Sequence, residues 1–391
     1  MFKLFQSNQM PLLVDAYTQR RASIETAPFS PEIVLVQNHG MGQWLKLELA
    51  QHMGIAANIS AELPGTYITG LYHQFLRTPV EKESAYSRNI LTWHIMDVLN
   101  STGTAQKTNN PFLPLINYLD GEGDRDLRLY QLSHQLAGLY EQYLIYRPAW
   151  IHAWDKGAPG PLICQQHPWQ ALLWQEIIRR TDERHRANLH LELLGIIDSI
   201  NPTELPARVS LFGFSSLPPM HFDTFRALAK KVEVDIYFLN PCQHYWGDIV
   251  SPKDIARRSV RDLIEQTSDA ALADEDYMDI GNPLLSSMGK QGREYFELLL
   301  SEESLDDATH FAPSAPNTIL SLLKNDVLNL EFGGTFGVGD KPKKLTHAAN
   351  DASIRIHSCH SKAREVEVLL DQIYQRCSDD PELVPNEIIV M

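Results

Sequence analysis

The strongest constraint on the fold is a strand that runs into a glycine turn and then into a helix. Pro31–Gln37 contains the run Ile-Val-Leu-Val, which is typical of a strand buried on both faces. The turn Asn38–Gly42 follows, and apolar residues then recur at helical spacing from Met41 to Met53, before Gly54. Strand, glycine turn and helix in this order predict the first unit of an α/β layer.

A second unit of the same kind begins near residue 208. Val209–Phe214 and Val232–Leu239 have strand patterns, and residues 220–231 between them have a helical pattern. Two strands joined by a helical crossover pair in parallel, so this unit is expected to extend the sheet begun by the first. The sequence therefore predicts an α/β fold with a parallel sheet.

The stretch between the two units has a different character. Residues 111–200 contain no convincing strand but long amphipathic segments at 126–146 and 169–180, separated by Pro and Gly. Residues 86–99 also have a helical pattern, and Leu63–Gly65 is expected to lead into a turn. We therefore predict that residues 111–200 form a helical insertion in the α/β domain.

The last third of the chain alternates between acidic and apolar stretches. Residues 264–280 and 302–317 are rich in Asp and Glu and are predicted to be solvated loops, while the stretch between them, 282–300, is predicted to be mostly helical. Glycines and lysines at 331–344 are typical of a linker. A new α/β domain is predicted at 345–391, with strand 353–358, helix 362–376 and strand Glu387–Met391. Because that last strand has no successor, we expect the sequence to be the N-terminal part of a longer protein.

Charge and cysteine content limit the functional classes. The 391 residues contain 34 Lys and Arg against 49 Asp and Glu, a net charge of −15, which excludes a histone-like or tail-like polycation. A nucleic-acid partner would have to be met by a local basic groove. The N-terminus lacks the features of a signal peptide, and no apolar run is long enough to span a membrane. The cysteines are scattered and predict no disulfide framework: Cys164, Cys242, Cys359 and Cys377. We therefore expect a cytoplasmic protein without a membrane partner.

Nucleotide hydrolysis is the first chemistry to test in such a layer. The loop His39–Trp44 lacks the Lys followed by Ser or Thr that would reach the phosphates and hold magnesium. Gly289-Lys290 is followed by Gln291 and is not preceded by a strand. Phe212–Phe214 stands where an Asp-Glu pair would position magnesium and water. We therefore predict that this chain has no catalytic residues and binds neither ATP nor Mg.

Metal binding and nucleophilic catalysis are equally weak predictions. His357–His360 contains two histidines and a cysteine, but neighbouring ligands at this spacing cannot close a tetrahedral site and no second half is visible. Cys359 has no identifiable histidine partner that would activate it as a nucleophile. The sequence predicts no metal site.

Aromatic and basic side chains in the helical region leave two interpretations open. Bases of a single strand could stack on the rings while cations hold the phosphates, or the rings could simply be core. A nearby basic cluster is either a solvated face or a phosphate track. The aromatic stripe comprises Tyr140, Tyr143, Tyr146, Trp150 and Trp154, beside Arg147, His152 and Lys156, and the basic cluster comprises Arg179, Arg180, Arg184, His185 and Arg186.

Several motifs, in order along nearly the whole chain, resemble the RecC-type gamma chain of exodeoxyribonuclease V, a bacterial helicase–nuclease that processes double-strand breaks. They include Ile33–Leu45, Gln142–Trp150, His185–Leu189, Asn240–Asp248 and Cys359–Val368. The resemblance implies an inactive, P-loop-type superfamily-1-helicase fold. Its first motor-like domain would comprise 1–110 and 201–330, interrupted by the helical insertion, and its second would begin after the linker.

The resemblance also implies a function. In this family the gamma chain is non-catalytic, splits the duplex at a fork and scans the 3′-ended single strand for a hotspot sequence. The beta and alpha chains are its partners and carry the working motors and the nuclease, so ATP and Mg are expected only there. Two alternatives are a helicase or nuclease that is active on its own, and a structural scaffold without DNA contact in this region.

Family positions implicated in scanning map onto matching motifs of this sequence. Amides can donate to and accept from base edges, and arginines can grip phosphates or bases with two hydrogen bonds. The implied DNA-binding residues are Gln37, Gln43, Leu63, Leu139, Gln142, Arg147 and Arg186, and three further candidates depart from the family pattern: His39, Thr69 and Glu141. Gly138 departs as well. Because specificity is a difference between right and wrong bases, these departures bear on which hotspot is recognised.

Overall fold

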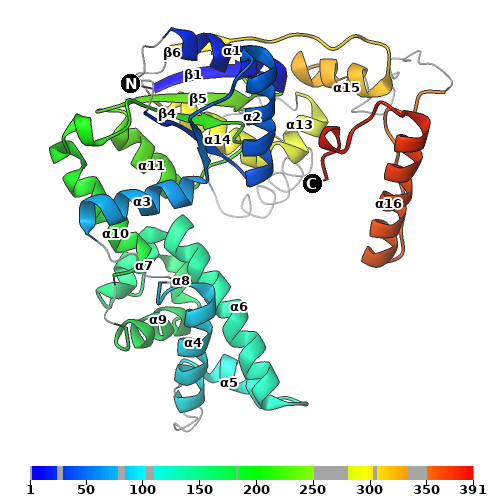
Figure 1. Cartoon of the computed structure of the whole chain (residues 1–391). Helices are drawn as coiled ribbons and strands as arrows, with labels where there is room; N and C mark the ends of the chain where they lie inside the picture. The colour runs from blue at the N-terminus through cyan, green and yellow to red at the C-terminus, as the bar shows by residue number, and fades with distance from the viewer. Residues whose placement is uncertain are drawn as a thin grey trace, which may run out of the picture. The chain divides into compact units, whose positions relative to one another are not determined.

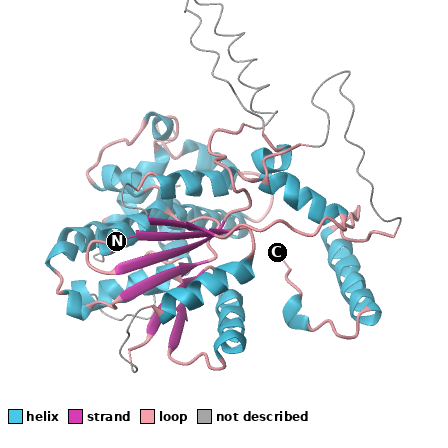
Figure 2. Ribbon diagram, turned by 90° about the horizontal axis from the view of Figure 1, so that it is seen from above, coloured by secondary structure: helices cyan, strands magenta, loops and turns pink. Residues whose placement is uncertain are grey.

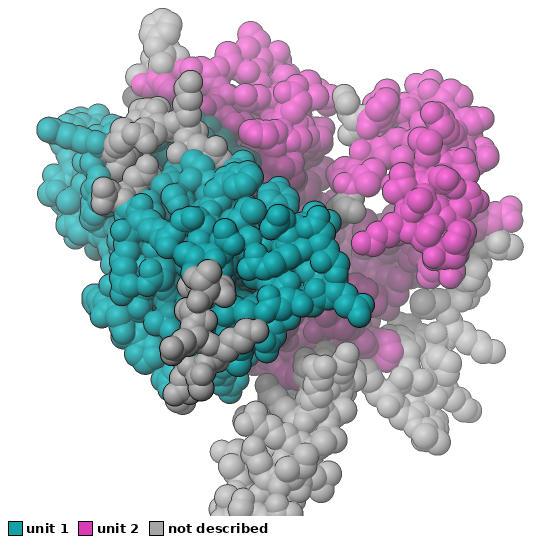
Figure 3. Space-filling view, turned by 90° about the horizontal axis from the view of Figure 1, so that it is seen from below, with its two compact units in different colours: residues 1–2, 62–209, 217–234 teal, residues 3–61, 210–216, 235–391 magenta. Residues whose placement is uncertain are grey.

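A computed structural model describes residues 2–23, 30–77, 84–102, 110–181, 184–250, 281–302, 306–332 and 350–390 (Figure 1). The chain forms two compact units, coloured separately in Figure 3. Unit 1 comprises residues 1–2, 62–209 and 217–234, and unit 2 comprises 3–61, 210–216 and 235–391.

The strands, magenta in Figure 2, form one sheet. Their order in the sheet is β3-β2-β4-β5-β1-β6. Hydrogen bonds join like ends of neighbouring strands: the Glu233 amide donates to the Ala207 carbonyl at 3.2 Å, and the Gly213 amide to the Tyr237 carbonyl at 2.9 Å. β1 and β6 also pair in parallel, with Lys3 opposite Asp306. The α/β prediction with a parallel sheet is confirmed. The strand bounds are β1 (Phe2–Ser7), β2 (Glu32–Val36), β3 (Ile59–Glu62), β4 (Arg208–Phe212), β5 (Glu233–Leu239) and β6 (Asp306–Thr309).

Unit 2 is built around this sheet. Two helices, α1 (Met10–Ala22) and α2 (His39–Met53), bury apolar side chains on it, including Tyr17 and Leu49. Gly42 lets α2 approach closely, because a Cβ there would lie 3.0 Å from that of Ala61. The remaining helices are α13 (Pro283–Met288), α14 (Lys290–Leu300), α15 (Ile319–Leu328), α16 (Lys362–Asp379) and the 3₁₀ turn η3 (Pro385–Glu387).

Unit 1 is almost entirely helical. Between Glu62 and Arg208 the described residues contain helices and no strand, so residues 111–200 are helical as predicted. That they form an insertion stays a prediction. Its core is a cluster of buried aliphatic and aromatic side chains that includes Leu91, Tyr140 and Trp174. Its elements are α3 (Pro64–Leu76), α4 (Arg88–Thr102), α5 (Leu113–Leu119), α6 (Arg125–Tyr146), α7 (Pro148–Asp155), α8 (Leu162–Gln165), α9 (Trp169–Ile178), α10 (Arg186–Ile196), η1 (Ile197–Ser199), η2 (Pro202–Glu204) and α11 (Pro219–Leu228).

Two predicted strands are absent. Residues 353–358 and 388–390 have no strand structure, and η3 covers the start of the second segment. A strand needs a neighbour to pair its backbone, and Ile356 is instead 92% exposed. Conversely, the loop predicted at 302–317 contains β6, an edge strand whose backbone pairs with β1. An edge strand needs few apolar side chains, so the acidic sequence of β6 does not have the apolar pattern by which a strand is recognised.

Four elements near the N-terminus carry no clear sequence signal and were not predicted. They are β1, α1, β3 and α3, the last standing where a turn was expected after Gly65. The predicted loop 264–280 lies outside the described residues, as does the predicted linker beyond its first two residues. The division into domains at 1–110, 111–200, 201–330 and 345–391 stays a prediction.

Candidate nucleic-acid interface

Arg186 is the first residue of α10, and a buried hydrogen-bond network fixes its place. His185 caps the helix, its Nδ1 accepting the Asn188 amide at 3.3 Å. With Nδ1 an acceptor, Nε2 carries the proton and donates to Asp155 Oδ2 at 2.9 Å. Asp155 ends α7, and its Oδ1 accepts the indole N–H of Trp174 at 2.9 Å. The network thus ties the start of α10 to α7 and α9.

The charge balance of this network favours an ionised carboxylate. Burial alone would raise the pKa of Asp155, but the hydrogen bonds from His185 and Trp174 outweigh burial and lower that pKa. His185 is only 2% exposed and Trp174 is fully buried. The carboxylate is therefore the acceptor for two buried donors, and it sets the orientation of the residue that precedes Arg186.

Arg186 is half-buried, and its charge acts on two groups that are neutral at pH 7. Burial raises the pKa of Tyr72 on α3 to about 12, against the opposing effect of Arg186. Burial, followed by the charges of Arg186 and His190, lowers the pKa of His221 on α11 to about 4. Among the described residues, Arg186 has neither a hydrogen bond nor an ion pair. A half-buried cation that has no internal hydrogen-bond or ion-pair partner is available for an anion from outside.

The other cations of the basic cluster are neutralised. Arg179 pairs with Glu176, Arg180 with Asp97, and Arg184 with Glu192. His185 is buried in the network described above. The solvated-face interpretation therefore holds for three of the arginines, and Arg186 is the member of the cluster that keeps a free charge.

Arg147 lies at the junction of α6 and α7 and is exposed. Its guanidinium lies 5.6 Å from the centre of the Trp150 ring, a cation–π contact, and its Nη1 donates to the Tyr146 carbonyl at 3.1 Å. The Tyr146 ring is 49% exposed. An exposed cation against one aromatic ring, next in sequence to a second exposed aromatic residue, is suited to both a phosphate and a stacked base.

The rest of the aromatic stripe is mainly core. Tyr140 and Trp154 are fully buried, and Tyr143 and Trp150 pack against the same cluster with partial exposure. The Tyr140 hydroxyl donates to the Gln170 carbonyl at 2.7 Å, which satisfies it inside the protein. Of the two interpretations of this stripe, core packing is the correct one for its buried members, and only Tyr146 presents an open face.

The other implied residues of unit 1 differ in exposure. Gln142 is exposed on α6, Glu141 is half-buried, and Leu139 packs in part against the core cluster. Leu63 occupies the position before the first residue of α3 and is half-buried. The Thr69 hydroxyl donates to the Gly65 carbonyl one turn earlier at 2.8 Å, so its hydrogen is already used within the helix.

The remaining three implied residues belong to unit 2. Gln37, His39 and Gln43 are all exposed, at the carboxyl end of β2 and the first turns of α2. The Asn38 side chain caps α2 by accepting the Met41 amide at 2.9 Å, and Gln37 Nε2 donates to Ser215 Oγ at 3.4 Å. The structure thus brings these three side chains to one edge of the sheet. The seven others lie in unit 1.

Some residues of the candidate interface were not predicted from the sequence. Tyr72, His221 and Asp155 are far from Arg186 in the sequence and stand in no recognisable motif. Only the helix packing brings α3, α7 and α11 to the start of α10. The described residues contain no cluster of three His, Cys, Asp or Glu side chains that could hold a metal ion. Nor does any helix in the described ranges have the length and apolarity to cross a membrane.

Comparison with known proteins identifies the family. The model of the RecC N-terminal domain matches residues 2–330. The chain belongs to the RecC family. It is 34% identical over its whole length to the RecBCD enzyme subunit RecC of Escherichia coli (strain K12), of which it covers 37%, and 32% identical to that of Haemophilus influenzae, of which it covers 38%. The RecC subunit of Mycolicibacterium smegmatis is 27% identical over 99% of the chain. The chain therefore spans little more than a third of the length of these relatives.

Proposed function

We propose that this RecC-family chain is part of a non-catalytic DNA-binding subunit of a helicase–nuclease that processes double-strand breaks in DNA repair and recombination. It helps to split the duplex, scans the 3′-ended strand for a hotspot sequence, and scaffolds the complex with the beta and alpha chains. ATP and Mg act only in those partners. The observation that carries the proposal is the unpaired guanidinium of Arg186, held by a buried network beside neutral groups.

Each unit contributes its own proposed DNA contacts, and these contacts are of three kinds. Arg186 and Arg147 grip phosphates or bases, with Tyr146 as a stacking surface beside Arg147. Exposed amides, such as Gln142 in unit 1 and Gln37 and Gln43 in unit 2, read base edges because an amide both donates and accepts. None of these groups performs chemistry on the DNA. The parallel sheet, interrupted by the helical stretch between β3 and β4, supports the assignment as an inactive superfamily-1-helicase-like domain.

The experiment that tests the proposal is photocrosslinking of a labelled 3′-ended strand to the full-length protein assembled with its two partners. We expect crosslinks near Gln37–Gln43, Arg147 and Arg186, mapped by mass spectrometry. Crosslinks confined to the partners would make this region a scaffold. ATP or DNA hydrolysis by the isolated protein would contradict a non-catalytic role and favour an enzyme active on its own.

Substitution of Arg186 or Arg147, neither of which forms an ion pair with a described residue, should separate scanning from unwinding. Arg186→Gln and Arg147→Gln each remove about one phosphate or base contact, so we expect about tenfold weaker response to the recognition sequence and nearly unchanged unwinding. The slope of log affinity for single-stranded DNA against log salt concentration should fall by about one.

Arg184→Gln is the matched control, because Arg184 is two residues from Arg186 and already pairs with Glu192. It should leave both the hotspot response and the salt slope unchanged. An equal response in Arg186→Gln, Arg147→Gln and Arg184→Gln would overturn the site assignment.

A further inference from the structure

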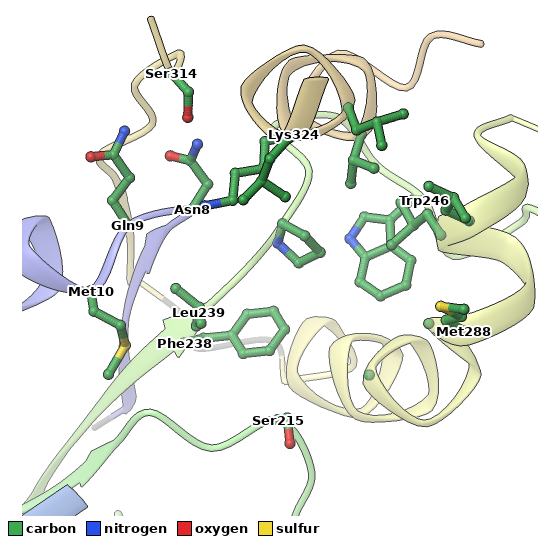
Figure 4. Close-up of a pocket in the computed structure, with 18 of the residues that line it drawn as sticks. Asn8, Gln9, Met10, Ser215, Phe238, Leu239, Trp246, Met288, Ser314 and Lys324 are labelled. Atoms are coloured by element: carbon green, nitrogen blue, oxygen red, sulfur yellow. The ribbon is translucent and has the colours of Figure 1, made fainter. Parts of the chain in front are cut away.

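A large cavity in unit 2 lies at the ends of two neighbouring strands whose following connections run to opposite sides of the sheet. The cavity has a volume of about 1170 Å³ and opens at the carboxyl ends of β1 and β5, which are neighbours in the sheet (Figure 4). β1 leads through α1 towards β2 on one side, whereas β5 leads through α13 and α14 to β6 on the other. In parallel sheets the loops diverge at such a point, and ligands bind in the crevice between them.

The loop after β1 is built differently from a phosphate-binding loop. The Asn8 side chain pairs with Ala312 in both directions, its Nδ2 donating to the carbonyl at 2.8 Å and its Oδ1 accepting the amide at 3.1 Å. The Gln9 amide donates to Ser7 Oγ at 3.0 Å, and Pro11 has no N–H to offer. The polar groups that would cradle a phosphate are thus engaged within the protein or missing.

The floor of the cavity is apolar and buried. Phe238 and Trp246 line it and are each 2% exposed. Trp246 stacks on Phe296 with ring centres 5.6 Å apart, and its indole N–H donates to Asn240 Oδ1 at 3.0 Å. Gly289 leaves room for this ring, since a Cβ there would come within 3.1 Å of it.

The rim is apolar but open to solvent. Leu284 is 43%, Met288 83% and Leu320 38% exposed. They come from α13 and α15 and are among the residues that line the cavity. Unpaired apolar side chains around a preformed apolar cavity are typical of a site that accepts an apolar group from a partner.

Among the described residues that line the cavity, Lys324 is the one charged side chain. It is exposed on α15, and in Figure 4 its ammonium reaches across the opening towards Asn8. Within the described ranges it forms no ion pair. In a chain of net charge −15, a lone unpaired cation over an apolar floor selects an occupant with an acidic group next to an apolar one.

We propose that this cavity is a docking site for a segment of a partner subunit of the complex, which places an apolar side chain on the Phe238–Trp246 floor and a carboxylate at Lys324. A protein segment fits this lining better than nucleic acid, because a DNA strand needs a series of cations along its phosphates and the described lining residues offer one. The relatives are named as subunits of the RecBCD enzyme, so protein partners exist for such a surface. This inference goes beyond the proposed DNA contacts.

A photocrosslinking residue at the rim tests the occupant. Met288→p-benzoylphenylalanine in the full-length protein, assembled with purified beta and alpha chains, should capture one partner subunit through a segment that contains an apolar residue beside Asp or Glu. The control is Ile55→p-benzoylphenylalanine, since Ile55 is 73% exposed in unit 2 but does not line the cavity. Capture of DNA, capture of this chain's own residues, or no capture beyond the Ile55 level would overturn the proposal.

Charge reversal tests the role of Lys324. Lys324→Glu should lower the yield of the Met288 crosslink about three- to tenfold, as expected for loss of one charge pair at an interface rim. Leu284→Asp puts a negative charge, of the same sign as the proposed carboxylate of the occupant, at an exposed position in the opening. It should lower the crosslink yield at least as much. The control Lys290→Glu changes a nearby exposed lysine outside the lining and should leave the yield unchanged.

Equal crosslink yields in Lys324→Glu and Lys290→Glu would contradict the proposal that the occupant places a carboxylate at Lys324. DNA crosslinking at Arg186 is measured in the same samples. It should be unaffected by every cavity variant, so failure of the docking proposal and failure of the DNA proposal can be distinguished.

Discussion

Asp155→Ala should lower the free energy of unfolding by about 3 kcal/mol, as measured by urea denaturation of the protein. The carboxylate accepts hydrogen bonds from His185 and Trp174, both almost fully buried. Alanine would leave these two donors without a partner, and each orphaned donor costs about 1–3 kcal/mol. Asp155→Asn keeps one acceptor oxygen and should lose about half as much.

Glu176→Ala provides the control for Asp155. Glu176 pairs with Arg179 on the protein surface, and an exposed pair of this kind contributes less than about 1 kcal/mol. A loss in Asp155→Ala no larger than in Glu176→Ala would show that the network does not stabilise unit 1. Because the network positions the residue before Arg186, Asp155→Asn should also weaken the response to the hotspot sequence. This response is measured at urea concentrations that leave the protein folded.

Unfolding should become about 3 kcal/mol easier between pH 6.5 and pH 4 because of His221. Its pKa falls from 6.5 to about 4 on folding, through burial and then through the charges of Arg186 and His190. In this range the unfolded chain binds a proton that the folded chain does not. The stabilisation is therefore complete above pH 6.5 and is lost as the pH falls through the folded pKa.

His221→Gln should flatten this acid limb in a series of urea titrations at different pH. His190 acts in the same direction, since burial also lowers its pKa, so part of the slope should persist. His39→Gln, on the exposed start of α2, is the control and should leave the slope unchanged. An acid limb as steep in His221→Gln as in the unaltered protein would contradict the assignment.

Sequence reasoning succeeded where burial imposes a pattern. β2, β4 and β5 lie inside the sheet and carry apolar runs, and their helices α2 and α11 follow the expected spacing. β1 also lies inside the sheet, yet its sequence Phe-Lys-Leu-Phe-Gln-Ser gives no clear signal because Gln6 and Ser7 are buried polar residues. Hydrogen bonds to distant residues, such as Ser7 Oγ to the His310 carbonyl at 2.7 Å, satisfy them.

The candidate site was predicted residue by residue but not as an arrangement. The free charge of Arg186 could not be distinguished from its paired neighbours, because the acids that neutralise them are up to 83 positions away. The bond between Asp155 and His185 spans 30 positions and belongs to no motif. Such contacts depend on how the helices pack, and neither helical spacing nor composition encodes that.

The position of β1 has a consequence for how the chain is made. β1 sits between β5 and β6 in the sheet, and its end is bonded to residues 303 positions later. At a synthesis rate of about 5–20 residues per second, the first strand waits roughly 15–60 seconds for its last neighbour to leave the ribosome. The helices of unit 1, whose contacts are mostly nearer in sequence, can form during that interval. An unpaired strand edge exposed for so long is a target for chaperones, and completion of the sheet is expected to be the slow step in biogenesis.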